Sequence, residues 1–271
     1  MIEHHDFTKP WAQNRRRVYR WVAAVMTAGY IVTAAGTGLK IFPTTPITGL
    51  VACIIFTNAI FVAFWACWFL EGPGKKRTTL EKADEFTMIW ACVAAVGSEM
   101  TWELPWLVAD ALGRAHITPH DRWVYIWYYY ARVDERYLIS DGALWGMEAV
   151  VILAAVLLLV QWFRLRSAPT HDPKRISALW WSLLAMVVML TIFVVYYAAE
   201  VRHGFANVQR GFWDITVIFV YENLPWLAAP IISIPLTAKQ LAYLYREQGR
   251  RTALAEEGAL ADDRADVRSL V

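Results

Sequence analysis

Charged residues and cysteines are scarce in this sequence of 271 residues. Only 18% of the residues are charged and 58% are hydrophobic, whereas roughly a quarter of a typical soluble domain is charged. The three cysteines, Cys53, Cys67 and Cys92, lie in apolar runs and form no CxxC pair. An odd number of such cysteines argues against a disulfide framework and against a metal site. We therefore expect no metal and no other cofactor.

The sequence also lacks a basic stripe and the alternating polar and apolar segments of a membrane β-barrel. The net charge is only +2, and without Lys and Arg clustered along one face we expect no nucleic-acid partner. The apolar residues gather instead in six blocks, each long enough to cross a hydrocarbon core of about 30 Å as a helix. These blocks are residues 18–40, 47–70, 86–112, 143–163, 176–199 and 212–245. The predicted fold class is an all-α, polytopic transmembrane helical bundle with six spans.

The positions of Lys and Arg predict the orientation of these spans. Most of the 26 Lys and Arg residues fall before the first span, after the second and fourth spans, and after the sixth. By the positive-inside rule, both termini are expected in the cytoplasm. We expect an integral multi-pass protein of the endoplasmic reticulum in a eukaryote, or of the plasma membrane in a bacterium.

Three regions follow from the same blocks. Residues 1–45 hold an N-terminal tail and the first span, and residues 46–246 hold the other five spans. Residues 247–271 are rich in Ala, Glu and Asp, and we expect them to form a polar, disordered tail. Because spans one and two are strongly apolar, they could serve a homodimer.

Five acidic side chains interrupt the apolar blocks, which is costly in a membrane. Glu99, Glu103 and Asp110 fall in the third block, and the spacing of four places the first two on one face of a helix. Glu148 lies in the fourth block and Glu222 in the sixth. Since intramembrane acids normally face a protein interior or a wet cavity, we expect them to line one polar cavity, with Asp110 near its end and outside the chemistry.

Amide and aromatic side chains accompany these acids. Asn223 follows Glu222 directly. The neighbouring tryptophans are Trp102, Trp106, Trp145 and Trp226. One carboxyl group can donate a proton and another can accept one, while the face of a Trp ring stabilises a developing cation. The set predicts protonation of an apolar substrate and loss of a proton elsewhere. Two alternatives stay open: the acids only hold helices together by hydrogen bonds, or they serve a proton-coupled transporter.

A short pattern around a proline occurs twice. Residues 102–107 read Trp-Glu-Leu-Pro-Trp-Leu, and residues 222–227 read Glu-Asn-Leu-Pro-Trp-Leu. A proline inside a span frees a carbonyl group one turn earlier and bends the helix. Two bent helices with polar groups at their bends could therefore enclose the pocket.

The longest connection, residues 113–141, contains an aromatic run at residues 123–130. Such a run is typical of an interfacial aromatic belt or of a lid that lies on the membrane surface. The sequence does not choose between these two interpretations.

Three further segments keep a common order and spacing. Residues 127–148 contain Trp, Tyr-Ala, Asp-x-Arg-Tyr, Asp and Met-Glu in that order. Residues 196–205 read Tyr-Tyr-Ala-Ala-Glu-Val-Arg-His-Gly-Phe, and residues 223–230 read Asn-Leu-Pro-Trp-Leu-Ala-Ala-Pro. Together they resemble the emopamil-binding protein family of sterol Δ8–Δ7 isomerases, within the EXPERA-domain superfamily.

The resemblance implies an EXPERA-like bundle over residues 46–246 whose cavity takes a sterol or another polycyclic or terpenoid lipid. In the family, a His and a Glu four residues apart, a second Glu, an Asn and a Trp carry the isomerisation. The matching positions, which are the expected catalytic residues, are Glu99, Glu103, Glu148, Asn223 and Trp226. The implied chemistry protonates a ring double bond, holds the carbocation, and removes a proton from the neighbouring carbon.

Other side chains are expected to contact the substrate rather than to move protons. They are Trp102, Trp106, Tyr137, Trp145, Tyr196 and Glu222. Span one has no counterpart in the five-span isomerases, so the resemblance assigns it no role.

Position 99 separates two possible functions. The family's His is replaced here by Glu99, and the pattern Glu-x-x-x-Glu-Leu-Pro-aromatic is closer to the sigma-2 receptor branch of the superfamily. Members of that branch bind sterol-like ligands or membrane proteins. The alternative hypothesis is therefore a non-catalytic sterol- or lipid-binding protein or scaffold, whereas the longer motif at residues 134–148 favours the enzyme.

Overall fold

The computed structural model describes residues 4–7, 13–72, 76–114, 116–131, 133–208 and 211–269. These residues are helical or irregular, and the only β pairing among them is a single bridge between Asp134 and Val208. Arg132, which belongs to the motif at residues 127–148, lies outside the described residues. The predicted all-α fold class is therefore confirmed.

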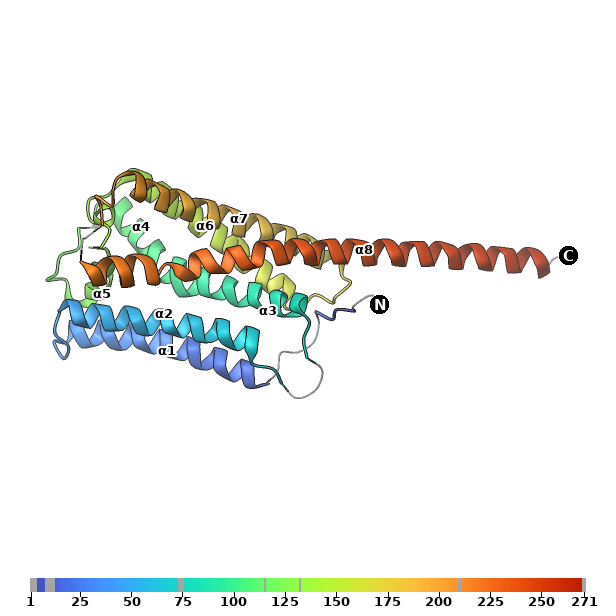
Figure 1. The fold of residues 1–271 in the computed structure, drawn as a ribbon, viewed down its shortest axis with the longest axis horizontal. Helices are drawn as coiled ribbons and strands as arrows, with labels where there is room; N and C mark the ends of the chain where they lie inside the picture. Colours follow the sequence, from blue (N-terminus) through green and yellow to red (C-terminus); the bar gives the residue numbers. More distant parts are fainter. Residues whose placement is uncertain are drawn as a thin grey trace.

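The bundle is built from long helices joined by short helical turns (Figure 1). Its main helices are α1 (Gln13–Gly38), α2 (Pro46–Phe69), α3 (Thr79–Cys92), α4 (Leu104–Ala111), α5 (Tyr125–Ala131), α6 (Gly142–Leu165), α7 (Pro173–Arg202) and α8 (Leu224–Ser269). The 3-10 helices are η2 (Arg122–Val124) and η3 (Glu135–Tyr137), and the π-helices are η1 (Val93–Glu103) and η4 (Asp214–Tyr221).

Polar caps in the sequence explain where several helices begin. The Asp141 side chain accepts a hydrogen bond from the Leu144 N–H group at 2.7 Å, and this fixes the start of α6. Thr78 and Glu81 form a reciprocal capping box at the start of α3. The first residue of α2 is Pro46, whose missing N–H group would have no helical partner there.

Five helices are long and apolar enough to cross a membrane. They are Arg15–Gly38, Pro46–Phe69, Gly142–Leu165, Pro173–Arg202 and Asp214–Gly258, among the described residues. Large apolar side chains such as Leu153 and Phe69 are about 70% exposed on their outer faces, as expected for groups that meet lipid. The chain is therefore compatible with a multi-pass membrane protein.

The third predicted span is not among these five. It forms a continuous helical rod, but α3, the π-helix η1 and α4 divide it into three shorter elements. The rod also carries Glu81, Asp84, Glu85, Glu99 and Glu103, which lower its hydropathy. The polar groups that mark this segment as functional also weaken its signal as a span.

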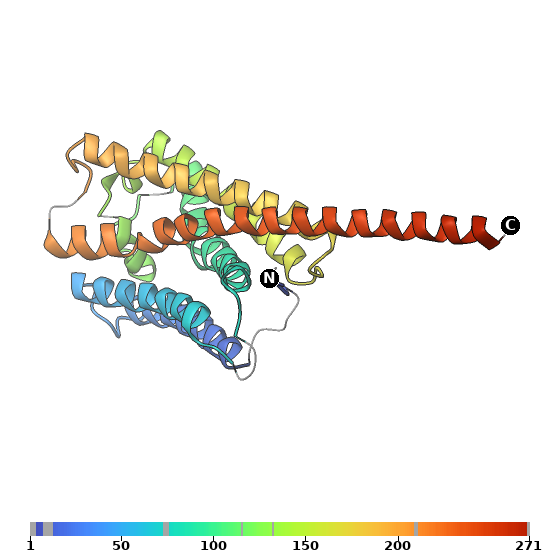
Figure 2. The same cartoon turned by 45° about the vertical axis from the view of Figure 1, so that its right-hand side comes forward.

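The α1–α2 hairpin lies on one side of the bundle, and α6 and α7 lie on the other (Figures 1 and 2). The rod of α3, η1 and α4 and the first part of α8 run between them. Residues 4–7 and the protruding part of α8 lie at the same end of the bundle (Figure 1). The segment from residue 247, expected to be disordered, continues α8 as a helix to Ser269. Its many Ala, Glu and Arg residues are strong helix formers.

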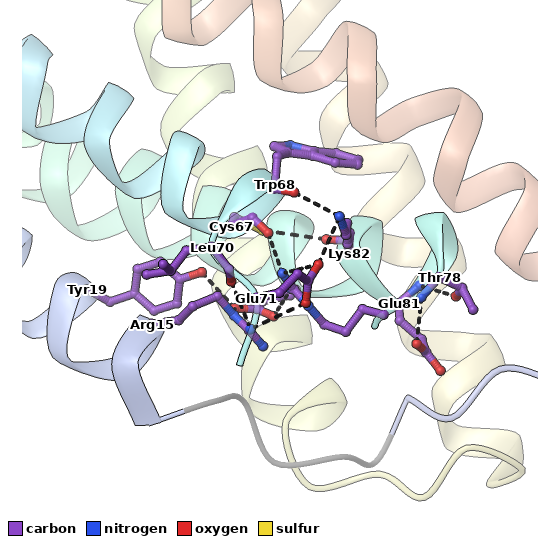
Figure 3. Close-up of polar contacts among 11 residues, drawn as sticks. Arg15, Tyr19, Cys67, Trp68, Leu70, Glu71, Thr78, Glu81 and Lys82 are labelled. Carbon is purple, nitrogen blue, oxygen red and sulfur yellow. Dashed lines mark hydrogen bonds and ion pairs between the residues drawn. The ribbon is translucent and has the colours of Figure 1, made fainter. Parts of the chain in front are cut away.

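An ionic cluster ties α1, α2 and α3 together at this end (Figure 3). The Arg15 side chain lies 2.9 Å from Glu85 Oε1, and the Tyr19 hydroxyl donates to the same oxygen at 2.6 Å. Lys82 Nζ lies 2.9 Å from Glu71 Oε1. Because Arg15 and Glu85 are almost fully buried, their pairing satisfies charges that would otherwise be costly inside the bundle.

The aromatic run of residues 123–130 closes the opposite end. Half of its side chains are buried, including Tyr125, Trp127 and Tyr129, whereas Trp123 and Val124 are exposed. The fit is close: a Cβ atom added at Gly49 of α2 would lie 2.2 Å from the Tyr129 ring. Neither an interfacial belt nor a surface lid describes these buried members, because they pack against α2 and the core.

Candidate functional site

A largely apolar cavity of about 1270 Å³, including its open mouth, lies between the α1–α2 hairpin and the rest of the bundle. Most of the side chains expected to act on a substrate line it. They are Glu99, Trp102, Glu103, Tyr137, Glu148, Tyr196, Glu222, Asn223 and Trp226. Side chains from span one, among them Met26, Tyr30 and Thr33, also line it. Its largely apolar and aromatic lining, with a few polar groups, is typical of a small-molecule site.

The π-helix η1 supplies the two central acids. Glu99 and Glu103 are 2% and 5% exposed, and both line the cavity. The Leu104 N–H group donates to the Glu99 carbonyl, which is the wider hydrogen-bond pattern of a π-helix. The Oε2 atoms of both carboxyl groups have no hydrogen-bond partner in the described part of the chain. Each acid therefore keeps one oxygen for a ligand, a proton or water.

The third acid, Glu148 of α6, is held by a tyrosine. The Tyr137 hydroxyl donates to Glu148 Oε1 at 2.6 Å. The backbone carbonyl of Tyr137 in turn accepts a hydrogen bond from the Trp106 indole N–H at 3.0 Å, and the two rings pack edge to face. Trp106 is expected from sequence to contact substrate, but it does not line the cavity. It is buried behind Tyr137 and orients it.

Trp226 of α8 also lines the cavity. Its indole N–H donates to Glu99 Oε1 at 3.3 Å, and its ring packs edge to face on Trp90. The side-chain amide of Asn223 donates to the Phe219 carbonyl at 2.8 Å. Asn223 therefore lines the cavity while its amide group satisfies the end of the π-helix η4.

Both copies of the repeated proline pattern end a π-helix. Pro105 follows η1, and Pro225 follows η4. The Glu222 N–H group donates to the Val217 carbonyl, five residues earlier, as Leu104 does to Glu99. Proline cannot supply the next helical donor, and both junctions place acidic side chains in the cavity. The bends themselves stay a prediction, while residues of both proline patterns line the cavity.

Two predicted members lie elsewhere. Trp145 is 38% exposed and donates to the Leu107 carbonyl at 3.4 Å, outside the cavity lining. Asp110 lies in the last turn of α4 and does not line the cavity. Without Asp110, the acids that line the cavity are Glu99, Glu103, Glu148 and Glu222.

A buried polar network behind Tyr196 was not predicted as part of the site. The Tyr196 hydroxyl donates to Asp134 Oδ2 at 2.6 Å. Arg136 Nη2 lies 2.6 Å from the same Asp134 oxygen and 3.0 Å from Glu200 Oε1. The network fixes the connection between α5 and α6 against α7. The Asp-x-Arg-Tyr motif was the available signal, since it places an acid and a base next to Tyr137, which was expected to contact substrate.

Comparison of the chain with protein-family models, curated proteins and solved structures gives no match. The chemistry of the cavity therefore carries the functional argument. Its described lining contains four acids and no Lys, Arg or His. Carboxyl groups in such surroundings exchange protons with each other, with tyrosine hydroxyl groups, or with a ligand. The apolar and aromatic remainder of the wall suits a lipid-like molecule.

Proposed function

We propose that this protein is an EXPERA-type membrane protein whose cavity binds a sterol or a related polycyclic or terpenoid lipid. The observation that carries the proposal is the convergence of Glu99, Glu103 and Glu148 in one apolar, aromatic-lined cavity. Glu148 and Trp226, which match the family's second Glu and its Trp, line the same cavity. The resemblance in sequence and the geometry therefore support the same site.

We also propose six spans with both termini in the cytoplasm. In this arrangement the rod of α3, η1 and α4 is the third span, because it runs through the bundle beside helices that are long enough to cross. The common position of residues 4–7 and the end of α8 supports termini on one side (Figure 1). The distribution of Lys and Arg supports the cytoplasmic side.

The first function we propose for the cavity is isomerisation of a ring double bond. A carboxyl group, Glu103 or Glu148, gives a proton to one carbon of the double bond. The resulting carbocation is stabilised by the Trp226 face and by the remaining acids. A carboxylate then removes a proton from the neighbouring carbon, which moves the double bond and regenerates the acid. No oxidant or cofactor is needed, because one proton enters and one leaves.

Isotope exchange in deuterated water tests this function. Purified protein in lipid vesicles is supplied with a panel of sterols and terpenoids, and deuterium in the recovered lipid is measured by mass spectrometry. Isomerisation should place solvent deuterium on a ring carbon, and Glu103→Gln or Glu148→Gln should abolish it. Absence of deuterium and of shifted product across the whole panel would contradict the enzyme.

The second function we propose is non-catalytic lipid binding, and two observations favour it. Position 99 carries a Glu where the isomerases have a His, and the Asn223 amide is engaged by the Phe219 carbonyl. A binding protein should take up sterol saturably without deuterium incorporation. Its affinity should survive Glu103→Gln and Glu148→Gln, because a carboxamide keeps the shape of the site.

A further inference from the structure

Three buried hydroxyl groups on α3 and α8 have no hydrogen-bond partner among the residues that the structure describes. They belong to Thr87, Ser233 and Thr237, which are 2%, 0% and 1% exposed. Serine and threonine in buried helices normally donate to the carbonyl group four residues earlier, as Ser182 does at 2.9 Å. Buried polar groups without a partner are rare and require an explanation, such as bound water. All three lie outside the cavity lining.

Two contacts define how α3 and α8 run past each other. At one end, Gln240 Nε2 donates to Asp84 Oδ1 at 2.7 Å. At the other, the Trp226 indole donates to Glu99. Nearly the same number of residues separates Asp84 from Glu99 along α3 and η1 as separates Trp226 from Gln240 along α8. The two segments therefore pack antiparallel and in register.

This register aligns the three hydroxyl groups. Thr237 comes level with Thr87, and Ser233 comes level with Ala91, a small residue that is 1% exposed. The hydroxyl groups therefore form a row that starts below the cavity and ends at Asp84.

Other polar features occur on α3 and α8. The Trp90 indole N–H has no partner in the described part of the chain, is fully buried, and belongs to the ring that packs on Trp226. Pro230 and Pro235 lie inside α8, and each withholds a donor from the carbonyl four residues earlier. The row thus offers both donors and acceptors, which bound water requires.

The end at Asp84 reaches the edge of the bundle. Asp84 pairs with Arg175, whose Nη2 donates to the backbone carbonyls of Leu165 and Ala168 in the α6–α7 connection. The same nitrogen lies 3.4 Å from the Phe7 carbonyl, so the N-terminal segment at residues 4–7 helps to cover this end.

We propose that the α3–α8 interface binds a file of water molecules that joins the acid cavity to Asp84 and exchanges protons with Glu99. Each hydroxyl group or water accepts one proton and releases another, so one proton moves along the file with no change of oxidation state. The file does not depend on which lipid the cavity binds. A route at the opposite end, through Tyr196 and Asp134, is the competing path and becomes an outcome of the test.

Exchange of indole N–H groups with deuterated water tests the proposal without a ligand. Full-length protein with 15N-labelled tryptophan is placed in lipid nanodiscs, and the Trp90 and Trp226 signals are assigned by Trp90→Phe and Trp226→Phe. In the variant Thr87→Val, Ser233→Ala, Thr237→Val, both indoles should exchange about tenfold or more slowly than in the wild type, since the polar partners of the water are lost. Thr237→Val alone should slow the exchange of both indoles to a smaller extent. It replaces the triple variant in the test if the triple variant does not fold.

Two controls separate the file from a general effect. The Trp127 indole is also buried and has no partner among the described residues, but it lies at the opposite end, so its exchange should not change. Ser182→Ala removes a buried hydroxyl that already has a partner, and it should leave Trp90 exchange as in the wild type. Equal Trp90 exchange in the wild type and in the hydroxyl variants would overturn the proposal. A slowing of Trp90 and Trp226 in Asp134→Asn but not in the hydroxyl variants would overturn it in favour of the opposite route.

Discussion

Replacing Arg175 by methionine should destabilise the protein by about 3 kcal/mol, because the buried Asp84 carboxylate would lose its cation. Arg175 is 1% exposed, and its Nη1 lies 2.6 Å from Asp84 Oδ1. Removing one partner of a buried pair costs roughly 3–5 kcal/mol. We expect the lower end because Gln240 still donates to Asp84 at 2.7 Å. Methionine fills most of the same volume, so a cavity adds little.

Reversible unfolding in mixed detergent micelles measures this loss, followed by tryptophan fluorescence. The matched control is Arg250→Met, which breaks the pair between Arg250 and Glu247 on the protruding part of α8. Arg250 is 54% exposed, and exposed pairs contribute at most about 1 kcal/mol.

A second variant tests whether the unpaired charge is the cause. Adding Asp84→Asn to Arg175→Met removes the charge but keeps an acceptor for Gln240, so part of the lost stability should return. The reasoning is refuted if Arg175→Met costs no more than Arg250→Met. It is also refuted if Asp84→Asn deepens the loss instead of relieving it.

Three further changes test other parts of the structure. Tyr137→Phe removes the 2.6 Å hydrogen bond to Glu148. It should weaken sterol binding or turnover by up to about tenfold, without a matching loss of stability. An unchanged Kd and rate would show that Tyr137 does not position the Glu148 carboxyl group. Arg122→Ala removes hydrogen bonds to the Thr37 carbonyl in the last turn of α1, at 2.8 Å, and to the Phe42 carbonyl in the α1–α2 connection, at 3.1 Å. The variant should lower the free energy of unfolding by about 1–2 kcal/mol. Partial burial acts to raise the pKa of Glu71. Hydrogen bonds from Lys82 and Arg77 outweigh this effect and hold the pKa below its ordinary value. Since this pKa is lower in the folded state, the stabilisation is present above the unfolded value of about 4.3 and is lost as the pH falls through the folded pKa. Thermal unfolding between neutral and acidic pH should show this loss, and Glu71→Gln should remove that part of it.

Hydropathy and the cost of buried charge predict the helical class and most of the site. Apolar blocks must form helices in a membrane, and five of the six blocks meet the length and composition of a span. Intramembrane acids must face a shared interior, which brings Glu99, Glu103, Glu148 and Glu222 to one cavity. The motif around Asp134 and Tyr137 also contained the hydrogen-bonding partner of Glu148.

The remaining features depend on packing that one sequence does not specify. Nothing in residues 93–103 distinguishes a π-helix from an α-helix, because the difference lies in the register of backbone hydrogen bonds. Trp106 and Trp145 are as aromatic as Trp102, but the turn of the helix sends them behind or outside the cavity. The contribution of span one to the cavity follows from the pairing of the α1–α2 hairpin with the bundle, which hydropathy does not encode.

Both proposed functions require the cavity to hold a sterol-like lipid, and binding of the fluorescent sterol dehydroergosterol tests this directly. Energy transfer from tryptophan to the sterol is titrated in vesicles that contain the protein, with unlabelled sterol as competitor. Wild type should give saturable, competable transfer. Val151 lines the cavity, so Val151→Phe should occupy the space for the sterol and abolish this transfer. Val150→Phe, on the adjacent exposed face, should leave the transfer unchanged. Transfer that does not saturate in the wild type, or that survives Val151→Phe unchanged, would contradict the account.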